Sequence, residues 1–357
     1  MKKIFAPFIV VIAVFCLAGC STKFNIAAPY KNITVIYGLL DQGDTAHYIR
    51  IEKAFLDQNK SALTMAKVAD SSYYAHLNVR INRILVSDGT TMHDTIHLNQ
   101  VDLDNEGYPK QAGTFFTAPN LAYKFTNTLD PLYIYRIIVT NYATGEVDSA
   151  NTIILSEDPT IFTCRFFDIP NQQFDFSSTL PNTVFPSFAF SYADPNNPNA
   201  LAGIGGTGQG VIRFNWVDSD ITTHTRTPRY YDDNLGYQIS SSSFAYSKSH
   251  IDLYYDLANG MGPAPTNVVR LIDRCDFFAY ISTPDFSSYY NNAQVQGTGL
   301  TGSEIEPLYT NILGANVLGL YTAKADRTDR ITLTTATVDS LIASPIMQQT
   351  LLVGTAY

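Results

Sequence analysis

The stretch that decides the fold is Leu129-Asp130-Pro131-Leu132-Tyr133-Ile134-Tyr135-Arg136-Ile137-Ile138-Val139-Thr140-Asn141. Pro131 fixes one backbone dihedral and lacks an N–H, so the chain is expected to turn there. From Tyr133 onward the residues are rich in tyrosine and β-branched side chains, and they alternate in a period of two. The stretch therefore predicts a sharp corner followed by a long, half-buried strand.

A leucine, a proline-containing corner and a tyrosine at the start of a strand resemble the tyrosine corner of Ig-like and fibronectin type III sandwiches. In that motif the tyrosine hydroxyl bonds to the backbone a few residues upstream. Either Tyr133 or Tyr135 could make this bond. The alternative is an ordinary hairpin that happens to contain an aromatic residue.

Strand-like runs continue on both sides of this corner, and several end at turn signals such as Asp88-Gly89. With the corner strand they make roughly seven runs, which predicts a sandwich over residues 33–156. The other runs are 33–40, 46–55, 74–87, 91–103, 121–126 and 148–155.

A polar, proline-bearing segment, residues 156–160, predicts a domain boundary. Beyond it we expect a β-rich second domain over residues 161–357 with one main helix, residues 266–281. Six residues of that segment fall at helical spacing: Val268, Leu271, Ile272, Cys275, Phe278 and Ala279. The strands predicted here are 184–192, 211–217, 250–257, 317–322 and 330–335.

The composition limits the classes of partner. The chain has 357 residues and a net charge of −9, and it has no basic cluster. This argues against binding nucleic acid or an anionic membrane surface. Aromatic residues make up 13% of the chain, which favours strands. These aromatics, with Trp216, could provide stacking platforms for sugars or a partner surface, or they could form the core.

The N-terminus has the pattern of a secretory signal peptide over residues 1–19. Lys2 and Lys3 precede an apolar run that is too short to span a bilayer permanently. Its end, Leu17-Ala18-Gly19-Cys20, resembles a bacterial lipobox. The resemblance implies cleavage before Cys20, a diacylglycerol on its thiol and an acylated amine. The alternative is an ordinary signal peptide with a chance cysteine.

Residues 20–32 then form a short lipidated tether. Two or more acyl chains hold a protein firmly on a membrane, whereas one binds only marginally. Ser21 follows the cysteine, where Asp would be typical of lipoproteins kept in the inner membrane. The position therefore resembles an outer-membrane sorting signal, and it leaves open whether the protein faces the periplasm or the outside.

Cys164 and Cys275 remain after the signal and the lipidated position are set aside. In an oxidising compartment they could form a disulfide, or they could be two buried free thiols. Two cysteines alone make no zinc site.

Asp102, Asp104 and Glu106 place carboxylates at alternate positions before Gly107. This spacing makes them a weak candidate for calcium, because Ca²⁺ takes six to eight oxygen ligands. The alternative is a solvated turn. We predict no other metal site and no cofactor. The motifs of the common hydrolases are absent from the sequence, so we predict no catalytic residue.

The segment Glu306-Pro307-Leu308-Tyr309-Thr310-Asn311-Ile312-Leu313-Gly314-Ala315-Asn316-Val317-Leu318-Gly319-Leu320-Tyr321 resembles a signature of Bacteroidota outer-membrane lipoproteins of unknown function. Genes of that family often lie beside those of TonB-dependent receptors. The resemblance implies a non-enzymatic accessory or binding component of nutrient uptake, with a β-barrel receptor as partner. The alternatives are a cell-envelope hydrolase acting on glycans or peptides, and a structural or adhesive surface protein.

Replacing the lipidated sulfur tests the anchor. A Cys20→Ser protein cannot receive a thioether-linked diacylglycerol, so it should move from the membrane fraction almost entirely to the soluble fraction. Ultracentrifugation of lysed cells followed by immunoblotting measures the partition. Cys16→Ser, inside the segment that is removed, is the matched control and should stay with membranes. Retention of the Cys20→Ser protein on membranes would contradict the predicted anchor.

Overall fold

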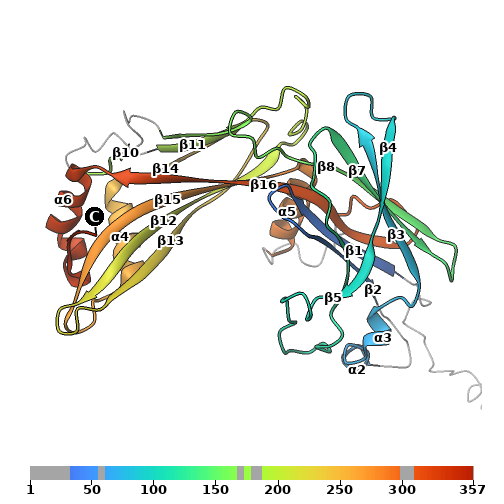
Figure 1. The fold of residues 1–357 in the computed structure, drawn as a ribbon, viewed down its shortest axis with the longest axis horizontal. Helices are drawn as coiled ribbons and strands as arrows, with labels where there is room; N and C mark the ends of the chain where they lie inside the picture. Colours follow the sequence, from blue (N-terminus) through green and yellow to red (C-terminus); the bar gives the residue numbers. More distant parts are fainter. Residues whose placement is uncertain (1–32, 55–60, 167–172, 178–186, 298–308, 357) are drawn as a thin grey trace, which may run out of the picture.

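The computed structural model describes residues 33–54, 61–166, 173–177, 187–297 and 309–356. The lipobox and the tether lie outside these residues. The protein is mostly β, as predicted, and Figure 1 shows two lobes joined by one long strand. The described residues form two separate hydrophobic cores, and the chain passes from the first to the second between Ile154 and Leu155 before it returns to the first over residues 312–323.

The first lobe is a sandwich of two antiparallel sheets, each with four strands from the N-terminal half of the chain. One sheet has the order β1 (Ile33–Asp41), β2 (His47–Ala54), β6 (Leu121–Phe125) and β5 (Asn99–Asp102). The other has the order β4 (Met92–His97), β3 (Leu77–Leu85), β7 (Tyr133–Asn141) and β8 (Val147–Ile153). This is the strand order of an Ig-like sandwich. Two short helices, α2 (Ala62–Met65) and α3 (Ala69–Ser72), lie between β2 and β3.

The corner bond is made by Tyr135 and not by Tyr133. The Tyr135 side chain is fully buried, and its hydroxyl oxygen accepts a hydrogen bond of 2.9 Å from the backbone N–H of Asp130. Tyr133 is half-buried, and its ring centroid lies 5.2 Å from the Arg83 guanidinium carbon. The period of two decides between them, because Tyr135 shares its face with the buried Ile137 and Val139.

The second lobe is built on a layer of long strands, called here the long sheet, which continues the sheet that contains β1. Their order is β13 (Arg226–Ser240), β12 (Gly206–Asp220), β15 (Val268–Ser282) and β16 (Val317–Leu333), and the short β17 (Leu352–Thr355) and β10 (Gln173–Phe174) pair with β15 and β16. A smaller sheet has the order β14 (Ser243–Ser247), β11 (Ser187–Tyr192) and β9 (Phe162–Phe166). The helices are α4 (His250–Met261), α5 (Pro284–Gly297) and α6 (Thr335–Ala343), followed by a 3₁₀ helix, Pro345–Thr350.

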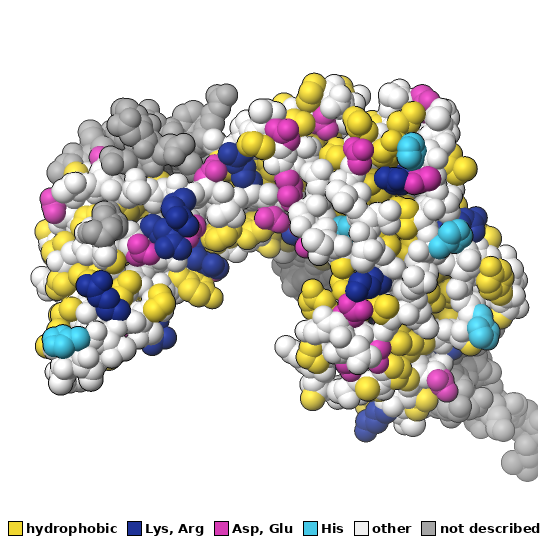
Figure 2. Space-filling view, viewed as in Figure 1, with side chains coloured by type: hydrophobic (Ala, Val, Ile, Leu, Met, Phe, Trp, Pro, Cys, Tyr) yellow, Lys and Arg dark blue, Asp and Glu magenta, His cyan; other side chains and the backbone are white. Residues whose placement is uncertain are grey.

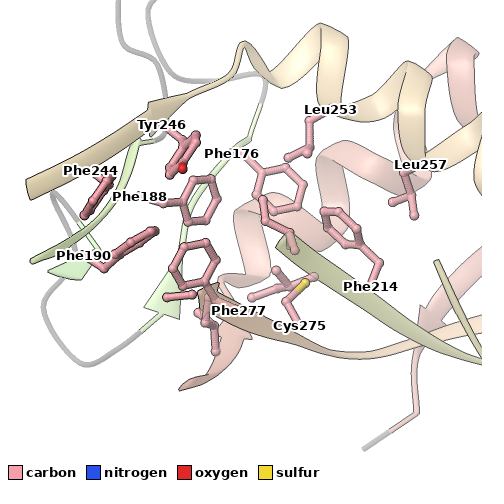
Figure 3. Close-up of a cluster of buried hydrophobic side chains, with 14 of the residues drawn as sticks. Phe176, Phe188, Phe190, Phe214, Phe244, Tyr246, Leu253, Leu257, Cys275 and Phe277 are labelled. Atoms are coloured by element: carbon pink, nitrogen blue, oxygen red, sulfur yellow. The ribbon is translucent and has the colours of Figure 1, made fainter. Parts of the chain in front are cut away.

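Aromatic side chains fill the space between the long sheet and the elements that cover it (Figure 3). Phe188 of the small sheet stacks on Phe277 of β15, with ring centroids 5.3 Å apart. Leu253 and Leu257 reach the same core from α4. Each fully buried Phe or Leu contributes roughly 1.5–3 kcal/mol, so this core holds α4 and the small sheet on one face of the long sheet.

The predicted helix 266–281 is wrong, because this segment is strand β15. A bulge explains the error: Phe214 pairs with Cys275, but Trp216, two residues further on, pairs with Ile272. The extra residue in β15 places Ile272 and Cys275, three apart, on one buried face. This spacing imitates the period of a helix.

The predicted strand 250–257 is also wrong, because it lies in α4. Its buried residues include His250, Leu253, Tyr254 and Leu257, which follow the helical period. Ser249 caps the helix by accepting a hydrogen bond of 3.1 Å from the Asp252 backbone N–H. This Ser-x-x-Asp pattern was the sequence signal for a helix start.

The long strand β16 belongs to both lobes. Its first part pairs in parallel with β1, from Thr34↔Val317 to Asp41↔Lys324. Its later part pairs with β15 in antiparallel fashion, from Ser282↔Lys324 to Cys275↔Ile331. The two strands predicted here are therefore one. The predicted sandwich of residues 33–156 is incomplete, since its core also includes Ile312, Val317 and Tyr321.

The residues of the lipoprotein-like signature attach β16 to the sandwich. The Asn311 amide donates to the Tyr321 carbonyl at 2.7 Å and accepts from the Tyr321 backbone N–H at 3.0 Å. Gly319 has a φ of +128°, and a Cβ there would lie 1.9 Å from the Ile36 carbonyl oxygen. Only glycine fits this close approach of two backbones.

Of the two alternatives for Cys164 and Cys275, the structure has free thiols and not a disulfide. Cys164 lies in the small sheet opposite Phe190, whereas Cys275 lies in the long sheet among buried aromatic rings. Burial raises the pKa of Cys164 to about 12 and that of Cys275 well above its usual value. Both thiols are therefore poor nucleophiles.

In the described part of the chain no helix has the length and apolar character needed to cross a membrane.

Tyr135→Phe tests the corner. It removes one hydrogen bond and leaves the Asp130 N–H without its partner, so the free energy of unfolding should fall by about 1–2 kcal/mol. Tyr133→Phe is the matched control and should change stability by less than about 0.5 kcal/mol. Urea denaturation followed by circular dichroism measures both. Equal losses in the two variants would show that the corner bond does not stabilise the fold.

Candidate functional site

Charged side chains from three distant segments meet where the two lobes join. Asp41 ends β1, Glu157 follows β8, and Lys324 and Asp326 lie in the middle of β16. Oxygens of the three carboxylates all lie within 4.8 Å of one another. The Lys324 ammonium pairs with Asp41 and, at 3.1 Å, with Asp326. We call these four residues the junction cluster.

Backbone pairing explains why these residues meet. The parallel register of β1 and β16 places Asp41 directly opposite Lys324. Glu157 is fixed by its own backbone N–H, which donates to the Gln42 side chain at 2.8 Å. One Glu157 carboxylate oxygen accepts from the Asp326 backbone N–H at 3.4 Å.

The two neighbouring carboxyls of the cluster have opposite pKa shifts. Burial, with the adjacent Asp41 carboxyl, raises the pKa of Glu157 to about 7. Burial also acts to raise the pKa of Asp41, but hydrogen bonds from Lys324, Glu157 and the Gly43 N–H outweigh it and lower that pKa. As the pH falls, this pair therefore takes up its first proton on Glu157, which is about half protonated near pH 7.

Three close carboxylates could hold a metal cation, but in this cluster the Lys324 ammonium already supplies the positive charge. The Lys324 ammonium lies within ion-pair distance of two of the three acids. Buried charges require such pairing, because removing them from water is costly. We therefore assign the cluster a structural role in joining the lobes.

A pocket of about 220 Å³ lies beside the cluster, and Lys324 is part of both. Its lining comes from β1, the long sheet and helix α5: Leu39, Thr207, Gln209, Tyr237, Tyr280, Ile281, Ser282, Phe286 and Lys324. Figure 2 shows a broad notch between the two lobes, and Figure 1 places α5 between them. We call this site the junction pocket.

The lining contains one pair of residues that resembles a catalytic dyad, Ser282 and Lys324, which face each other across β15 and β16. Burial acts to lower the pKa of Lys324, but its bonds with Asp41 and Asp326 outweigh this and raise it. A protonated amine cannot take the proton of a serine. The Ser282 hydroxyl donates instead to the Thr207 carbonyl at 3.4 Å. The pair is not an activated nucleophile.

The candidate calcium ligands Asp102, Asp104 and Glu106 lie in a turn in which they bond to other protein groups. One Asp102 oxygen accepts from the backbone N–H groups of Asp104 and Asn120, at 3.2 and 3.0 Å. Glu106 pairs with Lys124 at 2.5 Å. Each of these carboxylates bonds to the protein, and the three do not converge to a site among the described residues.

The sequence did not predict the junction pocket. Leu39, Gln209, Phe286 and Lys324 come from four separate elements, and none of them belongs to a local motif. Glu157 was part of the predicted linker. Its position after the first core, in an otherwise polar segment, carries no signal of burial.

Comparisons with known proteins give no family for this chain. No family model matches it, and no curated protein matches it. One similar solved structure is the C-terminal globular domain of an oligosaccharyltransferase from Pyrococcus abyssi, at 6% identity and a TM-score of 0.18. The match covers 87% of this chain and 53% of that one, so this chain spans about half of its length. A likeness this low carries no argument about fold or function.

The raised pKa of Glu157 predicts that its contribution to the free energy of unfolding depends on pH. Glu157→Gln should remove this dependence. Since the folded-state pKa of Glu157 is about 7 and its unfolded value is near 4.3, its stabilising contribution is complete below about pH 4.3 and is lost as the pH rises through 7. The variant should therefore become more stable relative to the wild type as the pH rises from 5 to 8. Thermal melts at several pH values measure this difference.

Comparing variant with wild type isolates Glu157 from other groups that titrate nearby. Burial raises the pKa of Asp148 to about 6, and burial lowers that of His47. Asp148 and His47 contribute to stability in both the wild type and the variant, so their contributions cancel in the difference between the two proteins. Asp158→Asn, at the exposed neighbouring position, is the control and should give a difference that does not vary between pH 5 and 8. A flat difference for Glu157→Gln would contradict the assignment.

Proposed function

We propose that this protein is a lipid-anchored, non-enzymatic binding component of the bacterial outer membrane. It binds a ligand in the junction pocket and works beside a TonB-dependent β-barrel receptor in nutrient uptake. The observation that carries the proposal is the pocket itself. Both lobes line it, with mainly aromatic and uncharged polar side chains. Such lining is typical of ligand-binding sites.

The position of the pocket supports a tethered role. The lipidated Cys20 would be followed by residues 20–32, which can reach at most about 45 Å when fully extended. The first described strand, β1, then runs directly to the pocket, where Leu39 is part of the lining. A lipid anchor so close to the site keeps the pocket near any partner in the same membrane and raises their effective concentration.

The chemistry of the pocket favours binding over hydrolysis. None of its lining residues is a histidine, a cysteine or a carboxylate. Its lysine is held protonated by ion pairs, so it cannot act as the general base for Ser282. The hydrolase alternative would need a catalytic set elsewhere in the chain.

Purification from native membranes in mild detergent tests this function. The wild-type protein should co-purify with a β-barrel receptor that mass spectrometry identifies. The Cys20→Ser protein should lose at least about nine-tenths of that partner, because it no longer shares the membrane. A monomer that hydrolyses glycans or peptides would overturn the proposal in favour of the enzyme.

A further inference from the structure

The floor of the junction pocket is a row of three side chains on neighbouring strands. Gln209 of β12 pairs directly with Tyr237 of β13 on one side and with Tyr280 of β15 on the other. Residues that pair in this way project from the same face of a sheet. Since neighbouring strands lie about 4.8 Å apart, the two tyrosines are about 10 Å apart and flank the glutamine amide.

Helix α5 packs on the Tyr237 ring and adds a third aromatic wall, while the Tyr280 ring stacks on Phe278 of its own strand. The Tyr290 ring packs on Tyr237 with centroids 4.9 Å apart, yet Tyr237 remains 47% exposed. Phe286, one turn earlier on α5, lines the pocket as well. The aromatic faces are therefore oriented before any ligand arrives, which lowers the entropic cost of binding.

The polar groups of the lining differ in whether they are already bonded. Thr207 shares a hydrogen bond of 2.7 Å with Ser287, and Ser282 donates to the Thr207 carbonyl. Within the described residues the Gln209 side chain has no hydrogen bond. Its amide offers two donors and one acceptor to the pocket.

The pocket offers no unpaired charge. Among the described residues, Lys324 is the one charged residue of the lining, and its ammonium is ion-paired with both Asp41 and Asp326. An anionic ligand would have to compete with two carboxylates for this ammonium. A cationic ligand would lie next to it. The charge pattern therefore favours a neutral ligand.

We propose that the junction pocket binds a neutral saccharide, an inference that rests on the proposed binding function and names its ligand class. The C–H faces of two linked sugar rings lie against Tyr237 and Tyr280, one sugar on each tyrosine, and sugar hydroxyls bond to the Gln209 amide. The spacing of the two rings fits two linked sugars. The volume of about 220 Å³ admits one or two sugar units, with any longer chain extending into the notch.

The test uses the purified Cys20→Ser protein, which keeps the whole mature chain. A panel of neutral mono- to tetrasaccharides of gluco, galacto, manno and xylo configuration is titrated by isothermal calorimetry, with galacturonic acid oligomers as the charged comparison. We expect at least one neutral series to bind, with affinity that rises from one to two units and then levels. Binding of none of these series, or tighter binding of the charged oligomers, would overturn the proposal.

Three variants locate the site. Tyr280→Ala and Gln209→Leu should each weaken binding roughly tenfold, from lost stacking or lost hydrogen bonds. Tyr230→Ala, an exposed tyrosine on β13 outside the pocket, is the control and should bind as the parent does. If Tyr280→Ala fails to fold, Tyr237→Ala replaces it at a more exposed position. Equal affinity in all variants would place the sugar elsewhere and overturn the assignment.

The outcomes separate this inference from the proposed function. If a receptor co-purifies but no saccharide binds, the proposed ligand class is wrong and the proposed partner is supported. If a saccharide binds but no β-barrel protein co-purifies, the proposed saccharide site is supported and the proposed role in uptake is wrong.

Discussion

The rest of the structure depends on the parallel pairing of β16 with β1. Without it, β1 would present a row of unpaired backbone groups at the edge of the sandwich, which proteins normally cover. The same strand continues into the second lobe, so the four strands of the β1 sheet and the long strands of the second lobe form one continuous sheet. The two cores are thereby joined by a continuous ladder of backbone hydrogen bonds. Asn311 and Gly319 make this pairing possible, one by bonding to the backbone of Tyr321 and the other by leaving room for β1.

The same pairing creates the chemistry of the junction. It brings Lys324 and Asp326 beside the end of β1, where Asp41 and Glu157 are already half-buried or buried. Four ionisable groups so close together are tolerated because Lys324 pairs with Asp41 and Asp326 and because the raised pKa of Glu157 reduces its charge. The junction pocket lies directly beside them, so its only cation is already paired and its walls are left to aromatic and uncharged side chains. The structural and the binding parts of the junction are thus adjacent and share one lysine.

Local signals predicted the first lobe well. The alternation around Tyr135, the turns and the proline corner belong to short stretches, and most strands of the sandwich form close to where their pattern indicates. The exception is the predicted strand 91–103, which is two strands, β4 and β5, in opposite sheets. The same reasoning failed in the second lobe over residues 250–281, where strand and helix were exchanged. A bulge opposite Phe214 and Trp216 shifted the period of β15, while the cap at Ser249 outweighed the apparent alternation of α4. Periodicity indicates which residues share a face of a strand or helix. A single inserted residue in a strand changes the spacing of its buried residues, so the strand can be mistaken for a helix.

The sequence by itself determined the mostly-β class, the sandwich with its tyrosine corner and the change of core near residue 155. Local periodicity and turn chemistry indicate these properties, although the strands that pair in the sandwich lie as far apart as His47 and Phe125. Only the tertiary structure decided which face of β7 is buried, and with it which tyrosine makes the corner bond. It also decided that Cys164 and Cys275 stay apart and that β16 crosses from one lobe to the other. The junction cluster and its pocket were likewise decided there. They join segments more than a hundred residues apart, and no short-range pattern records which distant strand a given strand will pair with.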